Sequence, residues 1–147
     1  MRLTISIFAV ALISASTAFA HHSLALFSTE TILTIQGVVT KVDWRSPHTT
    51  IFIEAKEPTG ETVEWRIETT PTSWLTSEGW TRDSLKPGDQ VKVETNPFGD
   101  RKVRYAWLLR ATKGDGTILL TRFSNRLQDP HAPPSSRARS PRHAGHA

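Results

Sequence analysis

The chain has 147 residues and contains no cysteine. It therefore forms no disulfide, has no thiol nucleophile and carries no lipid anchor on a cysteine. Several motifs that mark enzymes are also missing, namely G-x-S-x-G, H-E-x-x-H, G-x-G-x-x-G and the phosphate-binding P-loop. Glu54, Glu64 and Glu68 fall at outward positions of predicted strands, which does not indicate a paired acid–base site in a cleft. We predict that the protein is not an enzyme.

An excess of one charge sign is also missing from the body of the chain. The whole sequence has a formal net charge of +4, but residues 21–123 carry 13 basic and 13 acidic side chains. The surplus lies in Arg2 and in residues 124–147, where four arginines face one aspartate. Because a neutral core does not attract a phosphate backbone, we expect no nucleic-acid partner.

Residues 1–20 have the composition of a secretory signal peptide. A basic start at Arg2 is followed by an uncharged apolar stretch at residues 3–14, and Ala18-Phe19-Ala20 fits the small-x-small cleavage rule. Cleavage after Ala20 would leave His21 as the first residue. We therefore expect a periplasmic or secreted protein with no transmembrane segment after signal cleavage. An uncleaved N-terminal membrane anchor is the alternative.

Short segments between residues 34 and 120 alternate apolar and polar side chains, which is typical of β-strands. A short helix that Thr72 caps and Gly79 ends is expected after the third strand, and Thr81 is expected to cap a further turn. This order is typical of the OB-fold, so we predict a mainly β protein with a small OB-like Greek-key barrel of five to six strands and one short helix between strands 3 and 4. A two-sheet β-sandwich is the alternative. The predicted strands are residues 34–44, which bend at Gly37, 49–56, 62–69, 90–95, 103–112 and 117–120.

Large apolar side chains at these positions are expected in the core. Trp65 and Trp107 would lie inside the barrel, which would be plugged by the side chains of Trp74, Leu75, Trp80 and Leu85. Residues 21–123 form the predicted barrel domain. Residues 124–147 are rich in Pro, Ser, Arg and His and have few apolar side chains, so a disordered tail is predicted there.

The chain resembles a family of small exported bacterial proteins of unknown function. The matching stretches are His-His-Ser at residues 21–23, GVVTKV-x-W at 37–44, Pro47-His48, and GWTRDSLKPGD-x-V at 79–91. The resemblance covers about residues 21–120 and implies no catalytic role. The family pattern has Asn before Pro-His, whereas this chain has Ser46.

Three histidines are candidate metal ligands, and the candidate metal is copper. Cleavage after Ala20 would give His21 a free α-amine, which can chelate a metal together with the imidazole of His21 or His22. Nitrogen ligands in a flat arrangement favour Cu(II). His48 would complete the site if the N-terminal segment folds back. The ligands would then be of the same type as those in the histidine brace of exported copper proteins. A solvated terminus without a functional metal is the alternative.

OB-folds bind ligands on the face of strands 2 and 3 and on the loops after strands 1 and 4. This region offers two aromatic and three basic side chains, Arg45, Phe52, Arg66, Phe98 and Arg101. Such a mixture suits a sugar, a peptide or an anionic group. We predict a non-catalytic binding module whose partner is an unknown small ligand or another envelope protein. A Cu(II)-binding protein that uses the N-terminal histidines is the alternative.

Overall fold

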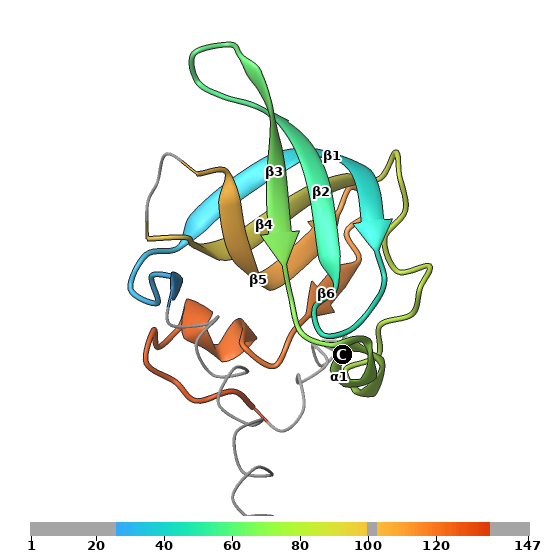
Figure 1. The fold of residues 1–147 in the computed structure, drawn as a ribbon, viewed down its shortest axis with the longest axis vertical. Helices are drawn as coiled ribbons and strands as arrows, with labels where there is room; N and C mark the ends of the chain where they lie inside the picture. Colours follow the sequence, from blue (N-terminus) through green and yellow to red (C-terminus); the bar gives the residue numbers. More distant parts are fainter. Residues whose placement is uncertain (1–25, 100–102, 136–147) are drawn as a thin grey trace, which may run out of the picture.

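Residues 26–99 and 103–135 are described by a computed structural model of the chain (Figure 1). The elements follow one another as β1 (Leu33–Asp43), β2 (Thr50–Lys56), β3 (Thr62–Glu68), α1 (Thr72–Ser77), β4 (Gln90–Pro97), β5 (Tyr105–Lys113), β6 (Ile118–Leu120) and the 3-10 helix η2 (Ser124–Leu127). The predicted signal peptide, the candidate ligands His21 and His22, and Arg101 lie outside the described residues. No helix within these described ranges has the length and apolar character needed to cross a membrane.

The strands form one sheet in the order β3-β2-β1-β4-β5-β6, which closes on itself. Closure comes from a short parallel pairing of β3 with β5, from Arg66 opposite Tyr105 to Glu68 opposite Trp107. The predicted OB-like barrel with one short helix between strands 3 and 4 is confirmed, and the sandwich alternative is not. Several strand ends differ by one or two residues from the prediction, as is usual where propensity alone sets a boundary.

β1 is long because it pairs with β4 along its first part and with β2 along its second. Gly37 lies where the two pairings overlap, opposite both Ala55 and Val91. A Cβ atom at residue 37 would stand 2.1 Å from the carbonyl oxygen of Glu54. The strand therefore needs glycine at this position because the neighbouring backbone approaches too closely for a side chain.

The barrel interior is filled by the inward side chains of the strands, including Ile51, Ile53, Trp65 and Ile67. Leu75 of α1 and two residues after it, Trp80 and Leu85, are buried against this core, as predicted for the plug. Trp74 was predicted wrongly, since its side chain is 43% exposed. Its indole lies beneath the guanidinium of Arg122, whose Cζ is 3.6 Å from the ring centroid.

The helix starts one residue earlier than predicted. Pro71 is the N-cap and Thr72 is already helical, and no side chain caps the helix start. The predicted end is confirmed, because Gly79 has a φ of +91° and donates its N–H to the carbonyl oxygen of Thr76. Thr81 caps no helix but closes a turn, in which its hydroxyl accepts from the N–H of Asp83.

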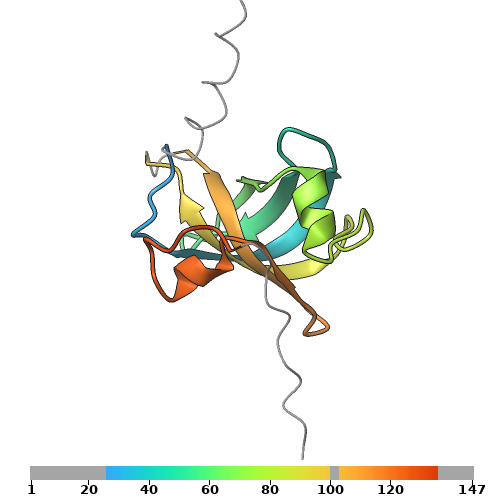
Figure 2. The same ribbon diagram turned by 90° about the horizontal axis from the view of Figure 1, so that it is seen from below.

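A second apolar cluster lies outside the barrel on β5 and is called the outer cluster. Trp107 and Leu109 of β5 are covered by Phe27 from the N-terminal side and by Phe123 from the C-terminal side. Trp107 is buried as predicted, but in this cluster and not in the barrel interior. Figure 2 shows that η2 and the segment before β1 lie on the side of the barrel away from α1.

Residues beyond Phe123, the predicted end of the barrel domain, continue to pack on the barrel. Leu127 of η2 packs against the outer cluster, and the N–H of Ser135 donates to the carbonyl oxygen of Arg122 at 2.8 Å. The first part of the segment expected to be a disordered tail therefore covers β5. The remainder, residues 136–147, lies outside the described residues.

Candidate functional site

Alternating cations and aromatic rings run across four neighbouring strands on the outside of the barrel. Lys41 of β1 is opposite Phe52 of β2, Phe52 is opposite Arg66 of β3, and Arg66 is opposite Tyr105 of β5. The Lys41 ammonium lies 5.1 Å from the centre of the Phe52 ring, and the Arg66 guanidinium lies 4.9 Å from that of Tyr105. We call these four side chains the cation–aromatic row.

The next row along the same strands carries carboxylates that hold these cations. It consists of Asp43, Thr50, Glu68 and Trp107, which are opposite one another in register. Lys41 forms an ion pair with Asp43 at 3.0 Å, and Arg66 forms one with Glu68 at 3.0 Å. Each cation is thus fixed by an acidic residue two positions along its own strand.

Glu68 is buried although it belongs to the outer face of β3. One of its oxygens accepts a hydrogen bond from Arg66 and the other accepts from the phenol of Tyr105. Burial raises the pKa of Tyr105 well above its ordinary value, and the hydrogen bond to the charged Glu68 raises it further. The sequence pattern predicts only an outward position for Glu68. It does not predict the contact with Tyr105, because the two residues meet through the β3–β5 pairing.

The predicted binding residues lie at different distances from the centre of this face. Phe52 and Arg66 are direct cross-strand neighbours. Arg45 pairs with Asp43 at 3.2 Å, and its side chain is 75% exposed. Phe98 is half-buried and packs against Tyr105, with 5.6 Å between the ring centres. It therefore forms part of a wall at the β5 end of the row.

The opposite flank of the cation–aromatic row is acidic. Glu54 of β2 and Glu64 of β3 are exposed and directly opposite each other. The hydroxyl of Thr40 donates to Glu64 at 3.4 Å. Like charges in this arrangement destabilise a sheet by a few tenths of a kcal/mol to about 1 kcal/mol. The row of cations therefore lies between two rows that contain carboxylates.

His48 lies in the loop between β1 and β2, next to the outer cluster. Its Nδ1 donates to the backbone carbonyl of Thr69 at 3.2 Å, and its ring packs edge-on against Trp107 with 5.5 Å between centroids. In the neutral imidazole this bond leaves the lone pair on Nε2. The ring is thus held by Thr69 and Trp107, whereas the hydroxyl of Ser46, where the resembling family has Asn, lies 3.4 Å from that of Thr72.

No group of three or more His, Cys, Asp or Glu side chains among residues 26–99 and 103–135 has the geometry to hold a metal ion. The copper prediction depends on residues outside those ranges. The first described residues after His21 and His22 in the sequence are Leu26 and Phe27, and Phe27 packs against Trp107 with 5.8 Å between ring centres. The rings of Phe27 and His48 thus contact the same indole.

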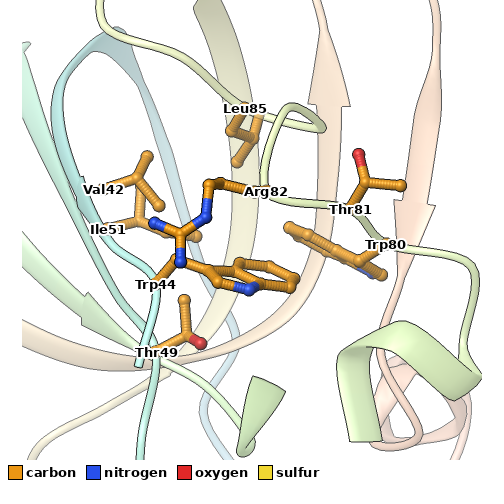
Figure 3. A pocket seen from close by; sticks show the side chains of 8 residues that line it. All are labelled: Val42, Trp44, Thr49, Ile51, Trp80, Thr81, Arg82 and Leu85. Atoms are coloured by element: carbon orange, nitrogen blue, oxygen red, sulfur yellow. The ribbon is translucent and has the colours of Figure 1, made fainter. Parts of the chain in front are cut away.

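A shallow hollow lies between the β1–β2 loop and the segment after α1 (Figure 3). It encloses about 190 Å³, including the part open to solvent. Sites for small organic ligands usually occupy roughly 300–1,000 Å³, so this hollow does not replace the outer face as the candidate site. It is lined by Val42, Trp44, Thr49, Ile51, Trp80, Thr81, Arg82 and Leu85.

These features define a small OB-like barrel with a charged and aromatic outer face. The chain belongs to the family of unknown function DUF6152, which matches residues 9–105. No curated protein matches it. Among solved structures, it is similar to the mitochondrial single-stranded DNA-binding protein Rim1 of S. cerevisiae, with 13% sequence identity and a TM-score of 0.41 over 62% of this chain and 96% of that one.

The prediction of no nucleic-acid partner is contradicted by this neighbour, which is a DNA-binding protein, and we withdraw it. That prediction rested on the neutral charge of residues 21–123 as a whole. Net charge does not decide what one face of a barrel binds, because the charges close to a ligand act most strongly on it. At this TM-score the likeness assigns no ligand to the chain.

Proposed function

We propose that the protein is an exported, non-catalytic binding module that takes its ligand on the outer face of β1, β2 and β3. The observation that carries this proposal is the cation–aromatic row. Together with the carboxylates of the neighbouring row, it combines donors, acceptors and an aromatic ring on three adjacent strands, in the region where OB-folds commonly bind ligands. The side chains of Lys41 and Arg66 remain 60% and 53% exposed, so a ligand can reach them.

The ion pairs of this face support a binding role because they fix the cations before a ligand arrives. Arg66 is held both by Glu68 and by the ring of Tyr105. Side chains that are already ordered lose less conformational entropy when a ligand binds. The opposed pair Glu54 and Glu64 costs stability, and a barrel that needed only to fold would gain from a neutral pair there.

The same contacts support a non-catalytic role. Glu68 is the buried carboxylate of the site, and each of its two oxygens accepts a hydrogen bond from a neighbouring side chain. A general acid or base must instead lie within hydrogen-bond reach of the substrate. We therefore assign Glu68 to holding Arg66 and Tyr105 in place.

Two experiments test this proposal. Export predicts that the protein appears in the periplasmic or secreted fraction with His21 as its first residue, which N-terminal sequencing determines. Binding is tested by amide NMR of the processed chain with a library of small polar fragments, and we expect the largest shifts at Phe52 and Arg66. Shifts that gather at the hollow near Trp44 and Arg82 instead would refute the assignment of the face.

A Cu(II) site is a second candidate function, and His48 is the observation that favours it. A histidine whose Nδ1 donates to a backbone carbonyl has its Nε2 prepared for a metal, an arrangement common around metal ligands. His22 is five positions before Phe27, and an extended chain of that length spans up to about 17 Å. The segment from His22 to Phe27 is therefore long enough for His21 and His22 to approach His48, because Phe27 and His48 pack on the same indole, that of Trp107.

The copper candidate is tested by Cu(II) titration with electron paramagnetic resonance on protein that begins at His21. The control is the same protein with an extra Met before His21, which blocks chelation by the α-amine at the correct position. Tight one-to-one binding that is lost both in the control and in His48→Ala supports the site. Weak binding that neither change affects would rule it out.

A further inference from the structure

We infer that the ligand of the outer face is an uncharged oligosaccharide. The inference deepens the proposed function and rests on it, because it concerns which class of molecule the cation–aromatic row recognises. It is drawn from the charge pairing on the face, from its hydrogen-bonding groups and from its length.

On this face Lys41, Arg45 and Arg66 are each paired with a carboxylate before any ligand binds. Lys41 and Arg45 share the carboxylate of Asp43, at 3.0 and 3.2 Å, and Arg66 is paired with Glu68 at 3.0 Å. The remaining N–H groups of these cations can still donate hydrogen bonds. A ligand that only accepts would leave the accessible carboxylates without a new partner, whereas one that both donates and accepts can bond to the cations and to those carboxylates.

Sugar hydroxyls have this dual character. Vicinal hydroxyls can donate to a carboxylate oxygen and accept from a neighbouring guanidinium or ammonium, and hydrogen bonds to charged groups are the strong ones. Lys41 offers a donor beside the carboxylate of Asp43 on β1. Arg66 offers a donor on β3, two positions from the exposed carboxylate of Glu64. Hydrogen bonds from hydroxyls to both kinds of group need no net charge on the ligand.

Phe52 supplies the apolar part of the same recognition. It lies between Lys41 and Arg66 in register and is half-buried. A pyranose ring has one face formed by C–H groups, which packs on an aromatic ring while its hydroxyls point sideways. Phe52 is placed so that these hydroxyls would meet the charged pairs on either side.

The length of the open face fits a short oligosaccharide. From β1 to β3 it spans two interstrand spacings, or roughly 10 Å. At the β5 end Phe27 and Phe98 pack against Tyr105, with ring centres 5.0 and 5.6 Å away, and close the row. Beside the row, Glu54 and Glu64 lie about 7 Å along the strands, within the distance over which charges act at physiological salt.

The inference is tested by amide NMR titration of the processed full chain with maltotriose and with chitotriose. Heparin fragments, an acidic peptide and a single-stranded oligonucleotide serve as parallel probes. We expect one of the trisaccharides to shift the amides of Phe52 and Arg66, with a Kd that changes less than about twofold between low and high salt, unlike binding to a polyanion. Phe52→Ala should weaken binding roughly tenfold or more, and Ile118→Ala, at an exposed position on β6, should leave it unchanged.

Each other result has a defined meaning, provided that circular dichroism shows both variants to be folded. If the peptide, heparin or the oligonucleotide shifts this face and neither trisaccharide does, the saccharide inference is overturned and the proposed binding face stands. If a trisaccharide binds equally well to Phe52→Ala, the face itself is wrong. If no probe shifts the amides of the face, the saccharide inference fails and the proposed function loses its main support.

Discussion

Tyr105→Phe removes one oxygen atom from the protein, and we expect it to lower the free energy of unfolding by about 2 kcal/mol at neutral pH. The phenol donates to Glu68, whose side chain is only 9% exposed. Hydrogen bonds to charged groups contribute about 1.5–3 kcal/mol, and the half-buried position of Tyr105 places this one in the lower part of that range. The ring contacts with Phe27 and Phe98 remain in the variant, so the loss reports on the hydrogen bond.

Urea unfolding followed by tryptophan fluorescence measures this loss, and a double-mutant cycle with Glu68→Gln isolates it. If the hydrogen bond exists, the double variant should lose at least about 1 kcal/mol less than the two single losses added together. A Tyr105→Phe variant within about 0.5 kcal/mol of the wild type, or full additivity, would refute the contact. The account of Glu68 as a positioning group would then fail with it.

Three further predictions follow from particular contacts. Tyr105 is the only tyrosine, and its raised pKa predicts that phenolate absorbance appears in the folded protein only well above pH 10. The stability that the phenol contributes is complete below its unfolded pKa of about 10 and is lost as the pH rises toward the folded pKa. Glu68→Gln should lower the midpoint of the phenol titration in the folded protein. Gly37→Ala should cost about 2–3 kcal/mol in urea unfolding because its Cβ would collide with a backbone oxygen, whereas Gly99→Ala, whose Cβ would be 3.5 Å from its nearest neighbour, should be nearly neutral. Arg122→Met should cost about 3 kcal/mol at pH 7 by leaving the buried Glu78 carboxylate without its partner. Burial already raises the pKa of Glu78 in the folded protein. The unfolding free energy of the variant should therefore recover as the pH falls through the folded pKa toward the unfolded one. An unfolding free energy that does not change between neutral and acid pH would contradict this.

The barrel could be predicted because alternation along the strands is strong. Ile51, Ile53 and Ile67 are completely buried, at alternate positions of two strands that this pattern predicted. Gly79 ended the helix as predicted because the left-handed conformation there favours glycine. Such signals are local, since each depends on a few neighbouring residues.

The local sequence pattern did not predict where two tryptophan side chains lie relative to the barrel interior. Trp107 alternates correctly for a strand, but its side chain faces the outside of β5, where Phe27 and Phe123 from distant parts of the chain bury it. Trp74 is kept at the surface by stacking with Arg122, which follows β6 in sequence. In both cases burial depends on segments outside the barrel strands.

The candidate site could be predicted only in part, because some of its contacts are local in sequence and others are not. Phe52 and Arg66 are brought together by a hairpin, and the meander of β2 and β3 made that pairing foreseeable. Glu68 and Tyr105 meet through a parallel pairing of strands that are far apart in sequence, and no local pattern announces such a register. Lys41 joins the face because β1 has an irregular register between Val39 and Lys41, which shifts its outward positions by one residue.

The most direct test of the proposed face is the side-chain Nε–H signal of Arg66 in NMR spectra of the processed protein. The account predicts that fragments or saccharides that bind will shift this signal, because the guanidinium lies exposed in the middle of the row. Arg110, paired with Glu94 between β4 and β5, is the internal control and should not move. If ligands bind while the Arg66 signal stays unchanged, the ligand site lies elsewhere and the central claim is contradicted.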